Sequence, residues 1–186
     1  MKIIDNFLTP SYADAIEDQF NSPHQEWFFN KNASYIEENE RFHMKFGFNF
    51  HIFRLDTGFS DCALTYFLKP LLFYIQDTVK CTRIVKCRID MTVASGTKVL
   101  HDPHIDIPFE YANGFDEYTT TIYYTSDSDG DTVLYNETEE SDQYTVMETV
   151  TPKKNRLLIF DGKRFHTGHS PMLHQNRVLI NSNFIL

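Results

Sequence analysis

Residues 118–162 read YTTTIYYTSDSDGDTVLYNETEESDQYTVMETVTPKKNRLLIFDG, and this stretch decides the fold class. Runs rich in Thr, Ile, Val, Tyr and Phe alternate with short polar segments, which is the pattern of successive β-strands. The dipeptides Asp129-Gly130 and Asp161-Gly162 are typical turn signals. We therefore expect four strands here, over 118–125, 131–136, 143–150 and 155–160.

Strand-like segments continue on both sides of this stretch. The dipeptide Ser95-Gly96 separates two of them, and RVLINSNFIL follows the loop after residue 169. Seven strands within about 105 residues, with no helical period among them, predict a sandwich or a barrel-like jelly roll. The further strands are expected over 82–94, 98–107 and 177–185.

The first eighty residues predict two helices that would cover one sheet. Thr9 is positioned to cap the first helix, with Pro10 at its first position. Ser60 is positioned to cap the second helix, which contains Pro70 and should kink or restart there and end before about Lys80. Its apolar stripe consists of Leu64, Phe67, Leu68, Leu71, Leu72 and Ile75. A strand between the helices is predicted by the alternation of Phe46, Phe48, Phe50 and Ile52.

The composition is that of one acidic globular domain. The 186 residues include 17 Lys and Arg against 26 Asp and Glu, a net charge of −9, and the pI is about 5.3. An acidic chain is poorly suited to nucleic acid, whose phosphates require a basic face. The 41% of hydrophobic residues are enough to fill a core, and the 23% of charged residues are too few for disorder.

Two further observations bear on the compartment. Cys62, Cys81 and Cys87 are odd in number and lack metal-site spacing, which fits free thiols in a reducing compartment. No apolar run approaches the length of a membrane span, and the opening MKIIDNFLTP lacks the layout of a signal peptide. We therefore expect a cytoplasmic protein without membrane association.

The segment His101-Asp102-Pro103-His104-Ile105-Asp106 suggests a metal site. On a strand, His104 and Asp106 would share a face and could bind one ion. A His and a carboxylate joined by a distant second His form the facial triad of non-haem iron(II) oxygenases. The alternative is a surface His beside a turn-forming Asp. His101 lacks a carboxylate two residues further on, so a loop or substrate contact is the better interpretation for it.

A second histidine and an arginine follow about sixty residues later. The buried run LLIF ends in the turn at Asp161-Gly162, after which His166 and His169 are both available as a third ligand. Arg177 opens the last strand and shares a face with Leu179, Asn181 and Asn183. An arginine pointing into a barrel is costly unless an anion pairs with it, and a dicarboxylate cosubstrate would be such an anion. The alternative is a pair with a surface carboxylate.

The order H-x-D, about sixty residues, His, eleven residues, Arg resembles that of the 2-oxoglutarate- and Fe(II)-dependent oxygenases. The prolyl-hydroxylase-like branch, with its small phage and bacterial members, is the most similar. The resemblance extends from about Arg83 onward through HID, TTTIYYT, DGDTVLYNE, NRLLIFDGKRFHTG and NRVLINSNF. It implies a mainly β fold with flanking helices around a double-stranded β-helix core, the cupin-like jelly roll. It also implies one oxygenase domain over 1–186, with a support region over 1–80 and the core over 81–186.

The resemblance implies a site as well. Fe(II) would be held by His104, Asp106 and His166, while His169 would lie beside the metal ligands or on the surface. The cosubstrate 2-oxoglutarate would meet Arg177 through its far carboxylate, assisted by Tyr124. With O2 as oxidant, the implied activity is hydroxylation with release of succinate and CO2. No catalytic residue beyond the metal ligands is implied.

Two departures from the family pattern narrow the function. The small residue expected two positions after Arg177 is replaced by Leu179, which alters the pocket floor. Position 183 is Asn, so the second arginine of AlkB-like nucleic-acid demethylases is missing. The expected prime substrate is a protein side chain or a small molecule, and the sequence indicates no oligomeric state. Two alternatives remain, a cupin-like metalloprotein that does not use 2-oxoglutarate and a non-catalytic jelly-roll binding module.

Overall fold

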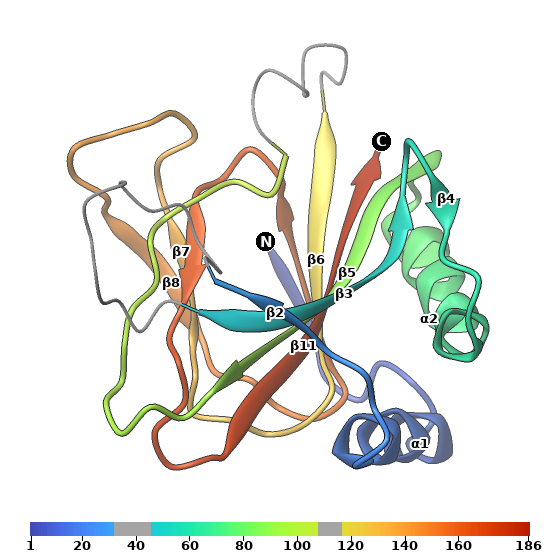
Figure 1. Cartoon of the computed structure of the whole chain (residues 1–186). Coiled ribbons are helices and arrows are strands. Elements are labelled where there is room, and N and C mark those ends of the chain that lie inside the picture. The colour runs from blue at the N-terminus through green and yellow to red at the C-terminus, as the bar shows by residue number, and fades with distance from the viewer. Residues whose placement is uncertain (32–45, 108–116) are drawn as a thin grey trace.

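Two antiparallel β-sheets and two helices make up the part of the chain that the structure describes, residues 1–31, 46–107 and 117–186 of a computed structural model (Figure 1). The helices are α1 (Pro10–Asn21) and α2 (Ala63–Val79). The strands are β1 (Lys2–Ile4), β2 (Phe28–Asn30), β3 (Gly47–Arg54), β4 (Gly58–Phe59), β5 (Arg83–Val93), β6 (Tyr118–Tyr124), β7 (Thr132–Tyr135), β8 (Val146–Val150), β9 (Arg156–Asp161), β10 (His166–Gly168) and β11 (Asn176–Ile185). None of the helices in these ranges is long and apolar enough to cross a membrane.

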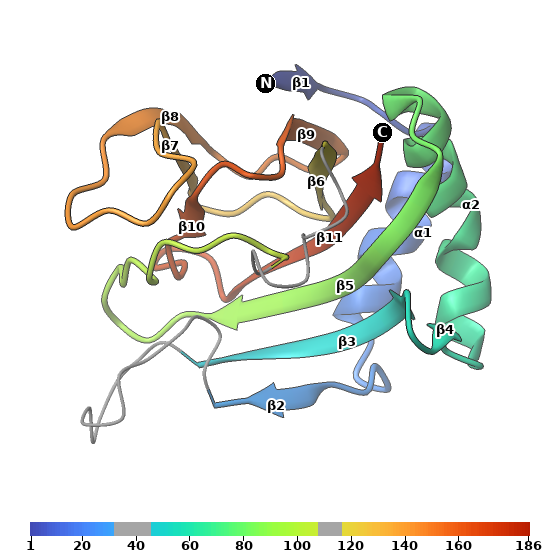
Figure 2. The ribbon, with the colours of Figure 1, turned by 90° about the horizontal axis from the view of Figure 1, so that it is seen from above.

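The larger sheet has the strand order β1-β9-β6-β11-β5-β3-β2, with β4 paired to β3, and the smaller sheet has the order β10-β7-β8. Figure 2 shows α1 and α2 on one side of the larger sheet and the smaller sheet on the other. Strands from the first eighty residues extend the larger sheet at both edges, where β1 pairs with β9 and β3 pairs with β5. The structure thus confirms the predicted mainly β jelly roll with flanking helices.

The side chains of the larger sheet alternate between two cores. On β6, Ile122 and Tyr124 enter the core between the sheets, and Tyr123 enters the core under the helices. On β11, Leu179 faces the smaller sheet, while Val178 and Ile180 face the helices. Burial of both faces explains why these strands carry apolar residues at adjacent positions, as in IYY of β6 and VLI of β11, and not only at alternate ones. The alternation also sets which side chains of β11 can reach the space between the sheets.

Helix α1 begins where the sequence predicts, with Thr9 at the N-cap and Pro10 in the first turn. The segment before it is tied to the sheet by Asn155, whose Oδ1 accepts from the backbone N–H of Leu8 at 2.8 Å and whose Nδ2 donates to the Leu8 carbonyl at 2.9 Å. Asn155 Oδ1 also accepts from the Tyr123 hydroxyl at 3.3 Å. The asparagine adopts a positive φ of 62°, a conformation that Asn tolerates well.

Helix α2 differs from the prediction at its start. Its N-cap is Cys62, and the predicted cap Ser60 instead donates its hydroxyl to the backbone carbonyl of His51 at 2.6 Å. The helix runs through Pro70 as one element, so no restart occurs there. It ends at Val79, with Lys80 in the left-handed conformation as its C-cap, in agreement with the predicted end before about Lys80.

The predicted strand over 98–107 is wrong. This segment makes only two isolated bridges, Leu100 with His169 and His104 with His166. Pro103 lacks an N–H and cannot donate to a ladder, which accounts for the break between the two bridges. His104 and Asp106 therefore do not lie on one face of a regular strand, although their side chains still converge.

Candidate metal centre

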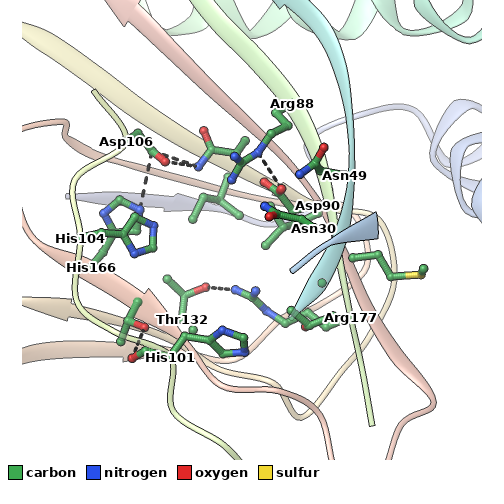
Figure 3. Close-up of a pocket in the computed structure, with 18 of the residues that line it drawn as sticks. Asn30, Asn49, Arg88, Asp90, His101, His104, Asp106, Thr132, His166 and Arg177 are labelled. Carbon is green, nitrogen blue, oxygen red and sulfur yellow. Dashed lines mark hydrogen bonds and ion pairs between the residues drawn. The ribbon is translucent and has the colours of Figure 1, made fainter. Parts of the chain in front are cut away.

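His104 and His166 face each other across the isolated bridge. The backbone N–H of each donates to the carbonyl of the other at 2.9 Å, and the ring centroids are 4.7 Å apart. Asp106 completes the group, with its Oδ2 atom 3.6 Å from Nε2 of His166. One possible ligand atom from each of the three side chains lies within 4.8 Å of the others (Figure 3). The structure thus brings together the three residues that the sequence proposed as metal ligands.

The two imidazoles are oriented by backbone carbonyls. Nδ1 of His104 lies 3.0 Å from the carbonyl oxygen of Asp102, and Nδ1 of His166 lies 3.3 Å from that of Arg164. A carbonyl oxygen only accepts hydrogen bonds, so these contacts favour a proton on each Nδ1. The Nε2 lone pairs are then free to bind an ion, as is usual for metal-binding histidines.

Asp106 is held by two asparagines that the sequence argument did not assign. Nδ2 of Asn181 donates to both carboxylate oxygens, at 3.1 and 3.0 Å, and Nδ2 of Asn183 donates to Oδ2 at 3.1 Å. Asn183 is fully buried and also donates to Thr120 Oγ1 at 2.9 Å. The available signal was the pair of amides on the inward face of the last strand, the face that also carries Arg177.

The charge states of the group suit a cation. Burial alone would raise the pKa of Asp106, but the nearby His166, Lys86 and His104 and the Asn181 amide hold it well below its ordinary value. Burial lowers the pKa of His166 to about 4. At neutral pH the site therefore presents one carboxylate and a neutral His166 imidazole, which are the forms that bind metals.

Arg177 lies buried at another position of the same pocket, with 7% of its surface exposed. Its Nη2 donates to Thr132 Oγ1 at 2.6 Å, and its Nε has no hydrogen-bond partner among the described residues. Space for the guanidinium depends on Gly168, because a Cβ atom there would lie 3.0 Å from Nη1. Burial lowers the pKa of Arg177. A buried guanidinium with an unused donor is suited to binding an anion.

Tyr124 is connected to the pocket through Thr132. It is fully buried, does not line the pocket, and donates its hydroxyl to Thr132 Oγ1 at 2.7 Å. Since Thr132 Oγ1 accepts from both Tyr124 and Arg177, its own hydrogen remains available to the pocket. The sequence does not single out Thr132, because a threonine in a β-strand carries no distinguishing pattern.

One pocket joins the metal group to Arg177. Leu179 and Ile122 form apolar parts of its lining, and His101 lines it as well, whereas His169 is not one of its lining residues. The polar lining that completes it comes from strands of the larger sheet, namely Asn30, Asn49, Arg88, Asp90 and Thr92. The pocket therefore has one wall that neither the metal group nor Arg177 occupies.

Comparison with known proteins shows similarity at the level of structure. Neither a protein-family model nor a curated protein sequence matches the chain. A prolyl hydroxylase from Trichoplax adhaerens, in complex with a hypoxia-inducible-factor peptide fragment, superposes with a TM-score of 0.66 at 20% identity, covering 99% of this chain and 82% of that one. A 2-oxoglutarate–Fe(II) oxygenase-family oxidoreductase from Burkholderia pseudomallei gives 0.58 at 14% identity, covering 94% and 78%.

A third similar structure is HygX from Streptomyces hygroscopicus with nickel and 2-oxoglutarate bound, with a TM-score of 0.59 at 9% identity, covering 98% of this chain and 81% of that one. The chain has the fold of the 2-oxoglutarate- and Fe(II)-dependent oxygenases. This oxygenase fold confirms the double-stranded β-helix core expected from the sequence.

Proposed function

We propose that the chain is an Fe(II)- and 2-oxoglutarate-dependent dioxygenase that hydroxylates its substrate. The observation that carries this proposal is that a single pocket contains both a His-Asp-His group and a buried arginine with an unused donor. Two imidazoles and one carboxylate are the ligand set of non-haem iron(II) oxygenases. The residues present therefore fit the metal that the fold implies.

In this proposal each residue has a separate task. His104, Asp106 and His166 would hold Fe(II), and Asn181 and Asn183 would keep the Asp106 carboxylate in place. When bound, the iron would supply the oxidation chemistry with O2, coupled to conversion of 2-oxoglutarate to succinate and CO2. The protein contributes binding, orientation and exclusion of water.

The cosubstrate would be bound through its distal carboxylate. Arg177 supplies a buried guanidinium and Thr132 supplies a hydroxyl hydrogen, while Tyr124 orients Thr132. The apolar side chains of Leu179 and Ile122 would line the adjoining part of the pocket. Bound 2-oxoglutarate in the structurally similar HygX supports this assignment. The prime substrate would be a small molecule or a protein side chain, and a peptide is bound in the similar prolyl hydroxylase.

The test is anaerobic addition of Fe(II) and then 2-oxoglutarate, monitored by visible absorption. Chelation of iron by the keto acid should produce a weak charge-transfer band in the wild type. Asp106→Ala should abolish the band, and Arg177→Gln should shift it to higher 2-oxoglutarate concentration. An iron spectrum unchanged by 2-oxoglutarate would instead indicate a cupin-like metalloprotein, and the absence of stoichiometric Fe(II) binding would indicate a non-catalytic module.

A further inference from the structure

The wall of the pocket beside the proposed cosubstrate site carries an arginine–aspartate pair. Strand β5 lies next to β11, and its inward side chains stand beside those of β11 in register. The cross-strand partners are Arg88 with Asn181, Asp90 with Leu179, and Thr92 with Arg177. Since neighbouring strands lie about 4.8 Å apart, the pair is one strand away from the side chains that the proposed function uses.

Arg88 and Asp90 form an ion pair in which Nε and Oδ1 are 2.6 Å apart. The Nε–H does not point at the carboxylate, so the contact is ionic rather than a well-aligned hydrogen bond. The two side chains are 20% and 23% exposed, and both line the pocket. Across the described part of the chain, the Nη atoms of Arg88 and Oδ2 of Asp90 make no hydrogen bond or ion pair.

Such a pair suits a ligand better than it suits stability. Partly buried ion pairs contribute little net stability, because desolvation of both charges opposes their attraction. The charge of Asp90 raises the pKa of Arg88, so the guanidinium stays charged at neutral pH. Asn49, the cross-strand partner of Asp90, also lines this wall. Figure 3 shows Arg88, Asp90, Asn30 and Asn49 grouped on the wall across from His104 and His166.

The atoms of Arg88 and Asp90 that do not take part in their ion pair indicate which charges a ligand should carry. The Nη groups of Arg88 can donate to an anion or another acceptor, and Oδ2 of Asp90 can accept from a cationic donor beside it. A dicarboxylate would place a negative charge against Asp90, and a diamine would place a positive charge against Arg88. An internal peptide unit carries neither charge. A zwitterion with both charges on one carbon satisfies both side chains and adds no net charge.

We propose that the prime substrate is a free α-amino acid, one of the twenty found in proteins. Its carboxylate binds Arg88, its ammonium group binds Asp90, and its side chain extends toward the metal group. This inference rests on the proposed function for its reaction but not for its binding step. The amino-acid site uses only side chains of β5 and its neighbours, which are separate from the ligands of the metal.

The experiment measures binding of each of the twenty amino acids by calorimetry, to protein freed of metal with EDTA and to protein with Fe(II) and 2-oxoglutarate without oxygen. We expect one amino acid, or a closely related group, to bind in a 1:1 ratio. Its methyl ester and its N-acetyl derivative should each bind about tenfold or more weakly, because each lacks one charge. Absence of binding by every amino acid in both states would overturn the proposal.

Variants assign the two charges separately. Arg88→Gln should remove the preference for the free acid over the methyl ester, and Asp90→Asn should remove the preference for the free amine over the N-acetyl form. Arg54→Gln is the matched control, since Arg54 pairs with Asp56 at the same spacing but outside the pocket. Unchanged preferences in the two pocket variants would contradict the assignment.

Failure of this inference is distinguishable from failure of the proposed function. The charge-transfer band with 2-oxoglutarate should persist in Arg88→Gln, which also shows that the variant folds. Loss of the band in Arg88→Gln, with the fold intact by circular dichroism, would place Arg88 in the cosubstrate site and overturn the amino-acid assignment. Stimulation of 2-oxoglutarate turnover by N-acetylated amino acids or peptides, and not by free amino acids, would overturn it as well.

Discussion

The side-chain amide of Asn181 spans both carboxylate oxygens of Asp106, with Nδ2 at 3.1 and 3.0 Å from them. The contact joins the centre of the larger sheet to a loop that has no regular ladder of its own. An amide in this position fixes the rotation of the carboxylate. The oxygen that faces His166 is therefore set by the sheet and not by the loop.

We expect Asn181→Leu to weaken metal binding by about 10- to 100-fold, because partners that orient a metal ligand contribute effects of this size. Affinity for Co(II) measured by competition with a chelator checks this. Ser182→Ala is the matched control, since Ser182 is equally buried on the same strand and contacts Cys87 instead. Equal metal affinities in the two variants would contradict a positioning role for Asn181.

Gly168 offers a test of Arg177 that leaves the guanidinium in the protein. A Cβ atom at position 168 would lie 3.0 to 3.2 Å from three atoms of that group, so Gly168→Ala should displace the guanidinium by a few tenths of an ångström. We expect the Kd for 2-oxoglutarate to rise about tenfold, on the scale of one charge-assisted hydrogen bond. Titration of the anaerobic charge-transfer band measures this, and unchanged Co(II) affinity serves as the control. An unaltered Kd would show that Arg177 does not bind 2-oxoglutarate.

Thr132 and Tyr124 should differ in their effects. Thr132→Val removes the hydroxyl oxygen to which both Nη2 of Arg177 and the Tyr124 hydroxyl donate, so the KM for 2-oxoglutarate should rise about tenfold. Tyr124→Phe removes only the hydroxyl that orients Thr132, and a rise of about threefold is expected. Steady-state succinate formation measures both. A larger effect of Tyr124→Phe than of Thr132→Val would show direct contact between Tyr124 and the cosubstrate.

The metal-free protein should lose stability in mild acid. Burial, followed by the charges of Arg88, Lys86 and Arg54, lowers the pKa of His51 from 6.5 to about 4. Between these two pH values His51 is protonated in the unfolded chain but neutral in the folded protein. The contribution of His51 to the free energy of unfolding is therefore fully present above pH 6.5 and is lost as the pH falls toward 4. The contribution is on the order of 1 kcal/mol, because His51 is only half-buried.

Urea unfolding at pH 7 and pH 5 checks the effect. The free energy of unfolding should decrease less between these two values in His51→Gln than in the wild type. His166, whose pKa is also lowered to about 4, keeps its own contribution in that variant. An identical decrease in the two proteins would exclude His51 as a source of the acid sensitivity.

The sequence correctly predicted the strands that carry a regular residue pattern over several positions. Strands β6, β9 and β11 are largely buried and carry short apolar runs, namely IYY, LLIF and VLI, and the Asp161-Gly162 turn signal lies at the end of β9. The three proposed ligands and Arg177 were chosen by spacing, and the structure gathers them around one pocket. Strands β10 and β11 set the direction of His166 and Arg177, whereas His104 and Asp106 lie outside the regular strands.

The remaining features depend on contacts between segments far apart in sequence. Asp106 is directed into the site by amides 75 and 77 residues away, and no periodicity in its own segment records that contact. Thr132 has its role because Arg177 and Tyr124 both donate to its hydroxyl oxygen. Ser60 does not cap α2, because its hydroxyl donates to a backbone carbonyl of β3 instead. Tertiary partners decide such cases, and a single sequence does not display them.

The position of β11 in the larger sheet has a consequence for the order in which the protein is made. Strands β5 and β6 emerge from the ribosome first, yet in the sheet each is a neighbour of β11 and not of the other. They cannot be joined until residues 176–185 have been synthesised and inserted between them. Long-range pairing of this kind slows folding and leaves strand edges exposed meanwhile. The asparagines that hold Asp106 and the arginine proposed to bind the cosubstrate all lie on this strand, so the proposed site is complete only after the sheet has closed.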